Sequence, residues 1–385
     1  MARSFRFGVS AAVCVAMLSL WGCGRPLVRE SAAPWTFAVS GDSRNCGNVV
    51  MPAIAEGAKN DHAVFYWHLG DLRAIYKIDE DFAAEDRFQA PSQLPTKKEY
   101  QSQAWPDFTQ HQVNAFGSMP FFLGIGNHET IPPKTVDQFR TEFASLLDRR
   151  ELHAQRLLDA ASMPAIPVTA SNQTYFHWME RGVDFINLDN ATDNAFDEAQ
   201  MAWFDAVLAK DLADEAVRSI VVGMHEALPY SRSYTHSMCD SVDGRRSGLH
   251  VYAQLIEARK HKPVYVLASH SHYYMADIFS TPHWQQEAGK DAVLPGWIVG
   301  TAGAVRYALP PDTSPGSDAR EKVYGYLIGT VATDGRITFS FRNISKDDLL
   351  RTRGAYTEAT VGACWDENSQ VEAMHNKPAG PGPCE

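Results

Sequence analysis

Five short segments of this chain end in side chains that could bind metal ions or transfer protons. Each segment starts as an apolar run, and the runs close on GD at 41–42, GD at 70–71, GNHE at 126–129, GMHE at 223–226 and SHSH at 269–272. Runs that are apolar at nearly every position are typical of strands buried on both faces of a sheet. Such strands deliver their last residues to one edge of the sheet, so we expect these side chains to meet there.

The candidate metal ligands combine carboxylates, a carboxamide and imidazoles, and they are Asp42, Asp71, Asn127, His225, His270 and His272. A mixed oxygen and nitrogen set suits Mn²⁺, Fe or Zn²⁺ and is a poor match for copper(I). A shared aspartate could bridge two ions about 3.5–4 Å apart, the separation used in two-metal hydrolysis. His270 and His272 alternate along an extended segment, which places both on one face. The pattern therefore predicts a metal centre.

Each of these residues also has an ordinary structural interpretation. A single aspartate after glycine is usually a turn or helix-cap residue, and His225 could be a hydrogen-bonded core histidine. Five such endings in one chain make coincidence a poor explanation. The other histidines are expected to have structural or surface roles; examples are His111, His177, His236 and His283.

The segments between the runs predict an α/β or α+β core with mixed sheets. Helical patterns cover residues 196–212, with acidic residues at the start, and 247–262, with a serine at the start and basic residues at the end. Antiparallel hairpins are expected around Arg181–Gly182 and Asp334–Gly335.

The N-terminal segment predicts export. Arg3 and Arg6 precede a short apolar stretch, and LWGC follows at residues 20–23. This ending resembles the lipobox of bacterial lipoproteins, in which Cys23 is lipidated and becomes the new N-terminus. Trp21 departs from the small residues usual there, and an ordinary signal cut nearby is the alternative. We expect a periplasmic or cell-surface protein that the lipid anchors to the membrane.

The composition limits the other partners. The chain has 385 residues, 45% of them hydrophobic, which is ample for a large core. The net charge is −11 and lysines and arginines are scattered, so a nucleic-acid partner has little support. After the N-terminus no stretch of ~20 apolar residues occurs, so no internal membrane span is expected.

Four cysteines remain after Cys23. Export would place Cys46, Cys239, Cys364 and Cys384 in an oxidising compartment, where they allow three pairings. We expect Cys364 to pair with Cys384, which would close a Pro- and Gly-rich tail. Cys46 would then pair with Cys239, since both follow candidate site residues by a few positions.

The order and wording of the motifs resemble the calcineurin-like metallophosphoesterase superfamily. The family pattern runs D-x-H, GD-x-x, GNH[ED], a lone H and GHxH, and the resemblance covers most of residues 35–345. GWIVGTAGA at 296–304 is similar to the Gly-rich strand near the family's end. The resemblance implies two mixed β-sheets packed as a sandwich and flanked by helices. The expected organisation is a signal peptide (1–23), a tether (24–34), a metallophosphoesterase domain (35–350) with insertions near 77–115 and 130–170, and a C-terminal tail (351–385).

By that resemblance, two metal ions share the site. Asp42 and His272 hold the first ion and Asp71 bridges, whereas the ligands of the second are Asn127, His225 and His270. A metal-bound water would attack the phosphorus of a small phosphate ester in line with departure of the alcohol. Mn, Fe or Zn would fit.

His128 would stay off the metal, stabilising the transition state or protonating the leaving oxygen. The expected reaction is hydrolysis of phosphate esters, chiefly phosphomonoesters. A phosphodiesterase or nucleotidase activity is one alternative. A non-catalytic protein that binds a phosphate ligand, with a weakened first metal site, is another.

The sequence departs from the family in two places. Ser269 stands where glycine is usual, a change that leaves the histidine spacing intact. Arg44 replaces the first-site histidine, and a guanidinium cannot act as a ligand. We therefore expect a weakly held first ion, with Arg44 and Asn127 contacting the substrate phosphate; a surface arginine turned away from the site is the alternative. The purple acid phosphatase branch would have tyrosine at Ala74, so that branch is not assigned.

Overall fold

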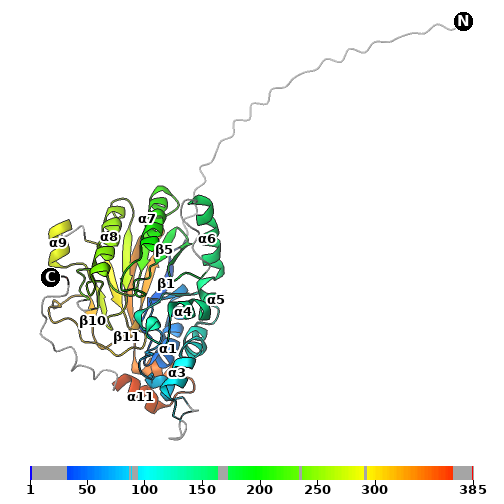
Figure 1. The fold of residues 1–385 in the computed structure, drawn as a ribbon, viewed down its shortest axis with the longest axis vertical. Helices are drawn as coiled ribbons and strands as arrows, with labels where there is room; N and C mark the ends of the chain where they lie inside the picture. The colour runs from blue at the N-terminus through cyan, green and yellow to red at the C-terminus, as the bar shows by residue number, and fades with distance from the viewer. Residues whose placement is uncertain are drawn as a thin grey trace. The chain divides into compact units, whose positions relative to one another are not determined.

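The computed structural model describes residues 33–85, 88, 94–163, 172–233, 236–289 and 293–366, together with Met1 and Cys384. The chain divides into two units, Met1–Ala32 and Ala33–Glu385, and all helices and strands lie in the second (Figure 1). Residues 2–32, which include Cys23 and nearly all of the expected signal peptide and tether, lie outside the described residues. Among the described residues, no helix is long and apolar enough to cross a membrane.

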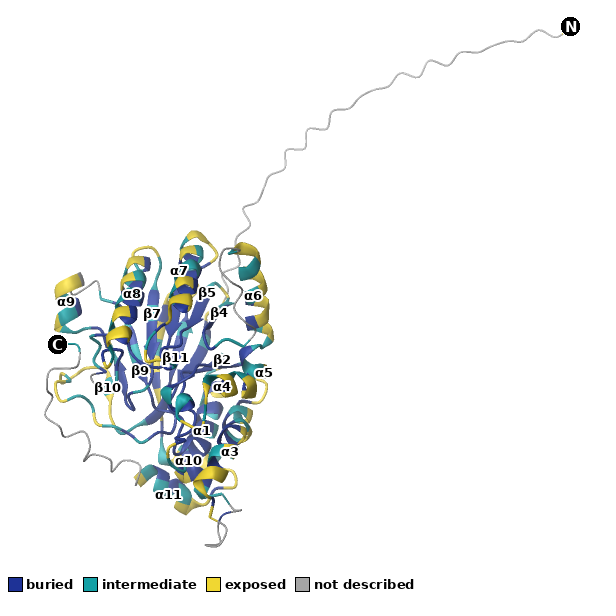
Figure 2. Cartoon of the chain, viewed as in Figure 1, coloured by how far each residue is buried: buried dark blue, intermediate teal, exposed yellow. Residues whose placement is uncertain are grey.

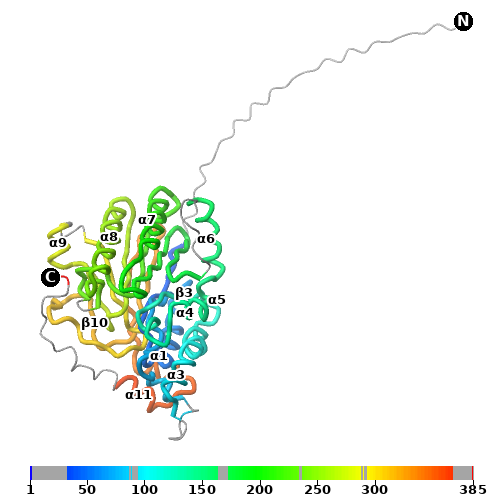
Figure 3. The backbone as a smooth tube through the Cα atoms, viewed as in Figure 1, coloured from blue at the N-terminus to red at the C-terminus, as the bar shows by residue number. Residues whose placement is uncertain are grey.

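The first sheet has five strands in the order β12-β11-β1-β2-β3. Its strands are β1 (Trp35–Ser40), β2 (Ala63–His68), β3 (Phe121–Leu123), β11 (Tyr324–Val331) and β12 (Ile337–Ile344). β1, β2 and β3 run parallel, and β11 pairs antiparallel with both β1 and β12. β11 therefore lies beside β1, although nearly 300 residues separate them in the chain. In Figure 3, β11 is orange and β1 is blue.

The second sheet has seven strands in the order β10-β8-β9-β7-β6-β5-β4. Its strands are β4 (Phe176–Glu180), β5 (Val183–Asn187), β6 (Ser219–Gly223), β7 (Val264–Ala268), β8 (Tyr274–Ala276), β9 (Gly296–Val299) and β10 (Ala319–Arg320). The central strands β5, β6, β7 and β9 are parallel; β4 and β8 run antiparallel to them, and β10 pairs antiparallel with β8. Two mixed sheets with flanking helices confirm the expected fold class.

An aromatic core joins the two sheets. Phe65 on β2 contacts Phe185 on β5 edge-to-face at 5.0 Å between ring centroids, and Phe122 on β3 stacks on Trp178 of β4 at 3.8 Å. Gly223, at the end of β6, lies against the ring of Trp67. Only glycine fits there, because a Cβ would collide with that ring. Aromatic pairs of this kind add about 0.5–1.5 kcal/mol each beyond the burial of their area. The sheets therefore pack as a sandwich.

Helices cover the outer faces, and they leave their polar sides exposed (Figure 2). They are α1 (Gly47–Asn60), α2 (Glu80–Ala83), α3 (Lys97–Phe108), α4 (Val136–Glu142), α5 (Ala144–Leu147), α6 (Arg150–Ser162), α7 (Glu198–Ala213), α8 (Val242–Ala258), α9 (Pro282–Ala288), α10 (Lys346–Thr352) and α11 (Glu358–Asp366). The expected insertions contain α2–α3 and α4–α6, and residues 86–87, 89–93 and 164–171 within them lie outside the described residues.

One helix begins earlier than the sequence pattern indicates. α8 was expected to start at Ser247, but its N-cap is Ser241, whose hydroxyl accepts the N–H of Gly244 at 2.8 Å. The first turn contains a single apolar residue, Val242, which is exposed, so apolar periodicity does not reveal it. This turn packs closely against the neighbouring loops. A Cβ at position 244 would collide with the backbone of Asn194 and Met238, so glycine is needed there. In contrast, the expected hairpins are confirmed, with β4–β5 turning at Arg181–Gly182 and β11–β12 turning at Gly335.

Both expected disulfide pairings are wrong. The structure joins Cys46 to Cys364, with 5.8 Å between their Cα atoms, and Cys239 to Cys384. α11 lies in the expected tail, and it packs beside α10 and α2 rather than folding back on the C-terminus. α10 in turn contacts α1. This packing places Cys364 on α11 next to Cys46 at the start of α1, 318 residues away in the sequence.

A buried histidine links α6 to the second sheet. The ring of His177 on β4 contacts Asp184 through Nδ1 at 2.7 Å and Asp159 through Nε2 at 2.8 Å. Lys210 also binds Asp159, at 2.9 Å. Burial alone would lower the pKa of His177, but Asp184 and Asp159 outweigh it and raise that pKa to about 10. The structural role expected for His177 agrees with this position.

We expect His177→Gln to lower the free energy of unfolding by about 3–5 kcal/mol near pH 6, since it leaves the buried carboxylate of Asp184 without its cation and Asp159 with Lys210 alone. The folded-state pKa lies above the reference value of 6.5, so this contribution is fully present below pH 6.5. It declines at higher pH and is lost as the pH rises through about 10. Urea unfolding at several pH values, with disulfides intact, measures it. A difference between wild type and variant that does not change with pH would contradict the assignment.

Candidate metal centre

The five motifs meet at one edge of the two sheets. Asp42 follows β1, Asp71 follows β2, and the 3-10 helix η5 (Asn127–Thr130) follows β3. From the second sheet, His225 follows β6 and His270 follows β7. Two sheets therefore supply ligands to a shared edge, as the apolar runs predict.

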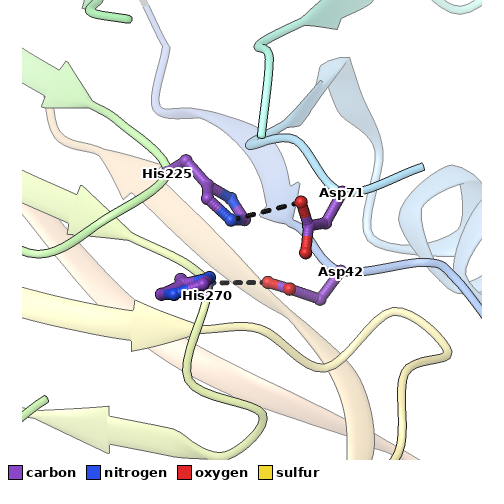
Figure 4. A group of neighbouring side chains, drawn as sticks. All are labelled: Asp42, Asp71, His225 and His270. Carbon is purple, nitrogen blue, oxygen red and sulfur yellow. Dashed lines mark hydrogen bonds and ion pairs between the residues drawn. The ribbon is translucent and has the colours of Figure 1, made fainter. Parts of the chain in front are cut away.

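Four of the candidate ligands form a tight group. Asp42, Asp71, His225 and His270 each offer a donor atom, and these atoms all lie within 4.8 Å of one another (Figure 4). Nε2 of His225 lies 3.3 Å from Oδ1 of Asp71 and 3.1 Å from Oδ1 of Asn127. His272 contacts Asp42 at 3.1 Å, so it lies next to the same group. All six predicted ligands therefore lie together.

Two buried donor atoms of this group have no hydrogen-bond partner. They are Nδ1 of His270 and Oδ2 of Asp71, and the second of these also lies 3.3 Å from Nε of Arg44 in an ion pair. Buried polar atoms are nearly always satisfied, so the nitrogen of His270 calls for an explanation, and a role as a metal ligand is one. The carboxylate, carboxamide and imidazole donors fit a divalent cation of the Mn²⁺, Fe²⁺ or Zn²⁺ type.

Three of these residues have a left-handed backbone. The φ angles are 60° at Asp42, 62° at Asp71 and 64° at His270. Asp and His tolerate this region better than most residues, but each instance still costs on the order of 1–3 kcal/mol. Such conformations gather at functional sites, because the surrounding structure must hold the side chains in place.

Main-chain carbonyls orient two of the imidazoles. Nδ1 of His225 donates to the carbonyl of Leu69 at 2.9 Å, and Nδ1 of His272 donates to the carbonyl of Val305 at 2.6 Å. Because a carbonyl can only accept, Nδ1 carries the proton in both rings. Burial lowers the pKa of His272, so its neutral ring presents the lone pair of Nε2 to the site. For His225, Asp71 and Asp42 outweigh burial and raise the pKa. A carbonyl on Nδ1 with Nε2 toward the site is the usual arrangement around metal-binding histidines.

The two carboxylates are ionised at neutral pH. Burial alone would raise the pKa of Asp71, but His128 and His225 together outweigh burial and lower it. The same balance holds for Asp42, whose pKa lies well below its usual range because of His272, His225 and Arg44. Two buried carboxylates beside imidazole rings suit a cation.

Glu129 supports the site in a way that the sequence pattern did not reveal. Its carboxylate accepts the backbone N–H groups of Asp71 at 2.9 Å, Leu72 at 3.0 Å and Gly126 at 2.8 Å. It thus ties the loop after β2 to the loop after β3. The only sequence signal was its place at the end of GNHE.

Ser269 also has a role that its departure from the family pattern did not disclose. Its hydroxyl donates to Oδ2 of Asp42, and the N–H of His270 donates to the same oxygen at 2.7 Å. The side chain of Ser269 lies in the space that a Cβ on Gly41 would occupy. Serine is accommodated here because residue 41 is glycine.

Arg44 lies inside the site. Its residue exposure is 6%, Nη2 lies 2.9 Å from Nε2 of His272, and Nε lies 3.3 Å from Oδ2 of Asp71. The alternative of a surface arginine turned away from the site is therefore wrong. Contact with a substrate phosphate, proposed for Arg44 and Asn127, stays a prediction.

His128 lies beside the metal-ligand group. Its Nδ1 donates to the carbonyl of Ala74 at 2.8 Å, and its Nε2 lies 3.6 Å from Oδ2 of Asp71. Burial lowers the pKa of His128, so its ring is neutral at neutral pH in this state. The partly exposed Tyr76 has its ring 5.4 Å from that of His128.

Two further rings complete the surroundings of the ligands. Tyr307 stacks on His272 with 4.0 Å between centroids, and the ring of His236 lies 5.0 Å from that of His270. A structural or surface role was expected for His236, but the structure places its ring beside a candidate ligand. No motif surrounds Tyr307 or His236, so sequence reasoning had no signal for either.

No protein-family model matches this chain, and no curated protein matches it. Solved structures similar to it include a purple acid phosphatase, PPD1, from yellow lupin (Lupinus luteus) seeds, with 14% identity and a TM-score of 0.49. That match covers 83% of this chain and 55% of the lupin protein, so this chain spans about half of that protein's length. PhoD is 15% identical with a TM-score of 0.48, covering 81% of this chain and 72% of PhoD.

A dimetal phosphatase from Danio rerio is 13% identical with a TM-score of 0.44, and the match covers 80% of this chain and 96% of that protein. All three likenesses are too distant to establish an activity, which is therefore argued from the side chains of the site.

Proposed function

We propose that this protein is a metal-dependent phosphoesterase that hydrolyses small phosphate esters, chiefly monoesters. The observation that carries the proposal is the donor group Asp42, Asp71, His225 and His270, in which Nδ1 of His270 is buried without a hydrogen-bond partner. Around this group lie a guanidinium at Arg44 and a neutral imidazole at a fixed orientation. These are the parts that phosphoryl transfer requires, since it depends chiefly on positioning and on neutralising charge.

A bound divalent ion would neutralise phosphoryl oxygens and lower the pKa of water. The chain's own residues supply the rest. The guanidinium of Arg44 is fixed by Asp71 and His272 and is close enough to the group to attract an anionic ester. The Nδ1–H of His128 donates to the carbonyl of Ala74, so Nε2 is the nitrogen left for the substrate. A proton on Nε2 would pass to a departing alkoxide.

We expect the purified protein to hydrolyse an aryl phosphate when Mn²⁺ is added, and to lose that activity when the metal is chelated. A panel of monoesters, a bis-aryl diester and nucleoside 5′-phosphates distinguishes a phosphomonoesterase from a diesterase or nucleotidase. Elemental analysis of the same sample determines which metals are bound. Bound metal without turnover of any ester would contradict the proposal and favour a phosphate-binding protein.

We further propose that the protein is exported, with a lipid on Cys23 anchoring it to the membrane. Two disulfides, Cys46–Cys364 and Cys239–Cys384, suit an oxidising compartment and so support export. The mass of the mature N-terminus tests the lipid, because an unmodified residue other than Cys23 there would contradict it.

A further inference from the structure

The place expected for a first metal ion holds a guanidinium. The ligands assigned to that ion are Asp42, Asp71 and His272, and Arg44 lies against two of them. Nη2 of Arg44 is 2.9 Å from Nε2 of His272, and Nε is 3.3 Å from Oδ2 of Asp71. The side chain of Arg44 is buried, and the hydroxyl of Tyr307 hydrogen-bonds it while the Tyr307 ring stacks on His272.

The guanidinium and a metal ion compete for one lone pair. Nδ1 of His272 carries the proton that the Val305 carbonyl accepts, so the neutral ring has a single free lone pair, on Nε2. A guanidinium has only donors, so its contact with Nε2 uses that lone pair. A metal ion would need the same lone pair at about 2.0–2.1 Å. The two cations therefore exclude each other at His272.

One oxygen of the third expected ligand is also committed. Oδ2 of Asp42 accepts both the hydroxyl of Ser269 and the N–H of His270, whereas Oδ1 lies 3.1 Å from Nε2 of His272 and receives no proton from it. Ser269 can reach Asp42 only because Gly41 leaves the space open. The two departures from the family pattern, Arg44 and Ser269, thus act on the same half of the site.

The other half keeps free donor atoms. Nδ1 of His270 is buried without a partner, and Nε2 of His225 faces oxygens of Asp71 and Asn127. Among the described residues, no guanidinium or ammonium group contacts the ring nitrogens of His225 or His270. A cation can bind there without displacing part of the protein.

We propose that this is a one-metal centre in which Arg44 permanently occupies the position of the first ion. The single ion binds through Asp71, Asn127, His225 and His270, and the guanidinium supplies the second positive charge from the chain itself. This deepens the proposed function and rests on it only for the role of that charge in hydrolysis, since the number of ions bound is independent of turnover. The sequence predicts a weakly held first ion, whereas in this proposal no first ion binds.

The test is the number of Mn²⁺ ions bound per folded chain, measured by elemental analysis after dialysis and by the EPR spectrum of the bound metal. Wild type should bind one ion and show the spectrum of an isolated Mn²⁺. His272→Ala should still bind one ion, because His272 holds Arg44 rather than a metal. His225→Ala should bind none.

A gain of function completes the test. Arg44→His with Ser269→Gly restores the imidazole and frees Asp42, so it should bind a second ion and show the spectrum of two coupled Mn²⁺ ions. Ser269→Gly alone is the matched control and should keep one ion, because the guanidinium remains. Two ions in wild type, or loss of an ion in His272→Ala, would overturn the proposal while leaving phosphoester hydrolysis intact. One ion with no ester hydrolysis would leave this proposal standing and contradict the function.

Discussion

His225→Ala is expected to release the bound metal and abolish phosphate-ester hydrolysis while the protein stays folded. The imidazole of His225 is held by the carbonyl of Leu69 and points Nε2 at Asp71 and Asn127. Removing a partner of a ligand already costs about 10–100-fold in metal affinity or activity, and removing a ligand itself should cost more. Metal content, Kd for Mn²⁺ and turnover of an aryl phosphate measure the effect.

Folding of this variant is checked by near-UV circular dichroism, which reports on the aromatic core between the sheets. His250→Ala is a matched control. That histidine lies on α8 and pairs with Asp205 at 3.0 Å, with both side chains partly exposed. The control should keep both its metal and its activity. Full activity in His225→Ala would refute its assignment as a ligand.

His128→Ala is expected to retain metal and lose about 10²–10⁴-fold in rate on esters with poor leaving groups, which is the usual contribution of acid catalysis. In the described structure His128 contacts Ala74 and Asp71, and it is not part of the tight donor group. An activated aryl phosphate needs less protonation as its leaving group departs, so its hydrolysis should suffer less. The rates on an alkyl and an activated aryl ester measure the difference.

His128→Gln separates two roles for this side chain. Glutamine can donate a hydrogen bond but cannot transfer a proton at neutral pH. If His128 is a general acid, the glutamine variant should be as slow as the alanine variant on the alkyl ester. Recovery of most of the rate by glutamine, or an equal loss on both esters in alanine, would instead show that His128 stabilises charge in the transition state.

Much of the scaffold was predictable from local pattern. The runs that became β1, β2, β6 and β7 are apolar at nearly every position, and strands buried on both faces need no other feature to be recognised. The polar residues that end them were recognisable because they interrupt that pattern. Parallel strands in one sheet bring such ends together, so the location of the site followed from the order of the motifs.

The helix starts and the disulfides were less predictable. Ser241 and Ser247 are both acceptable helix caps, and the choice between them depends on the close approach of Gly244 to a neighbouring loop. The cysteine pairs depend on where α11 docks, which nothing within the C-terminal sequence states. Proximity in the chain favoured Cys364 with Cys384, but the docking of α11 brought Cys364 to Cys46.

The residue types alone show which side chains could bind metal and that Arg44 could not be a ligand, because both follow from side-chain chemistry. The position of the guanidinium depends on how the chain packs, since a buried arginine and a surface arginine have the same sequence signal. Its contacts are with Asp71 and His272, residues delivered by different sheets. The number of positive charges that the site needs from solution is therefore a property of the packing of the two sheets, which no single motif contains.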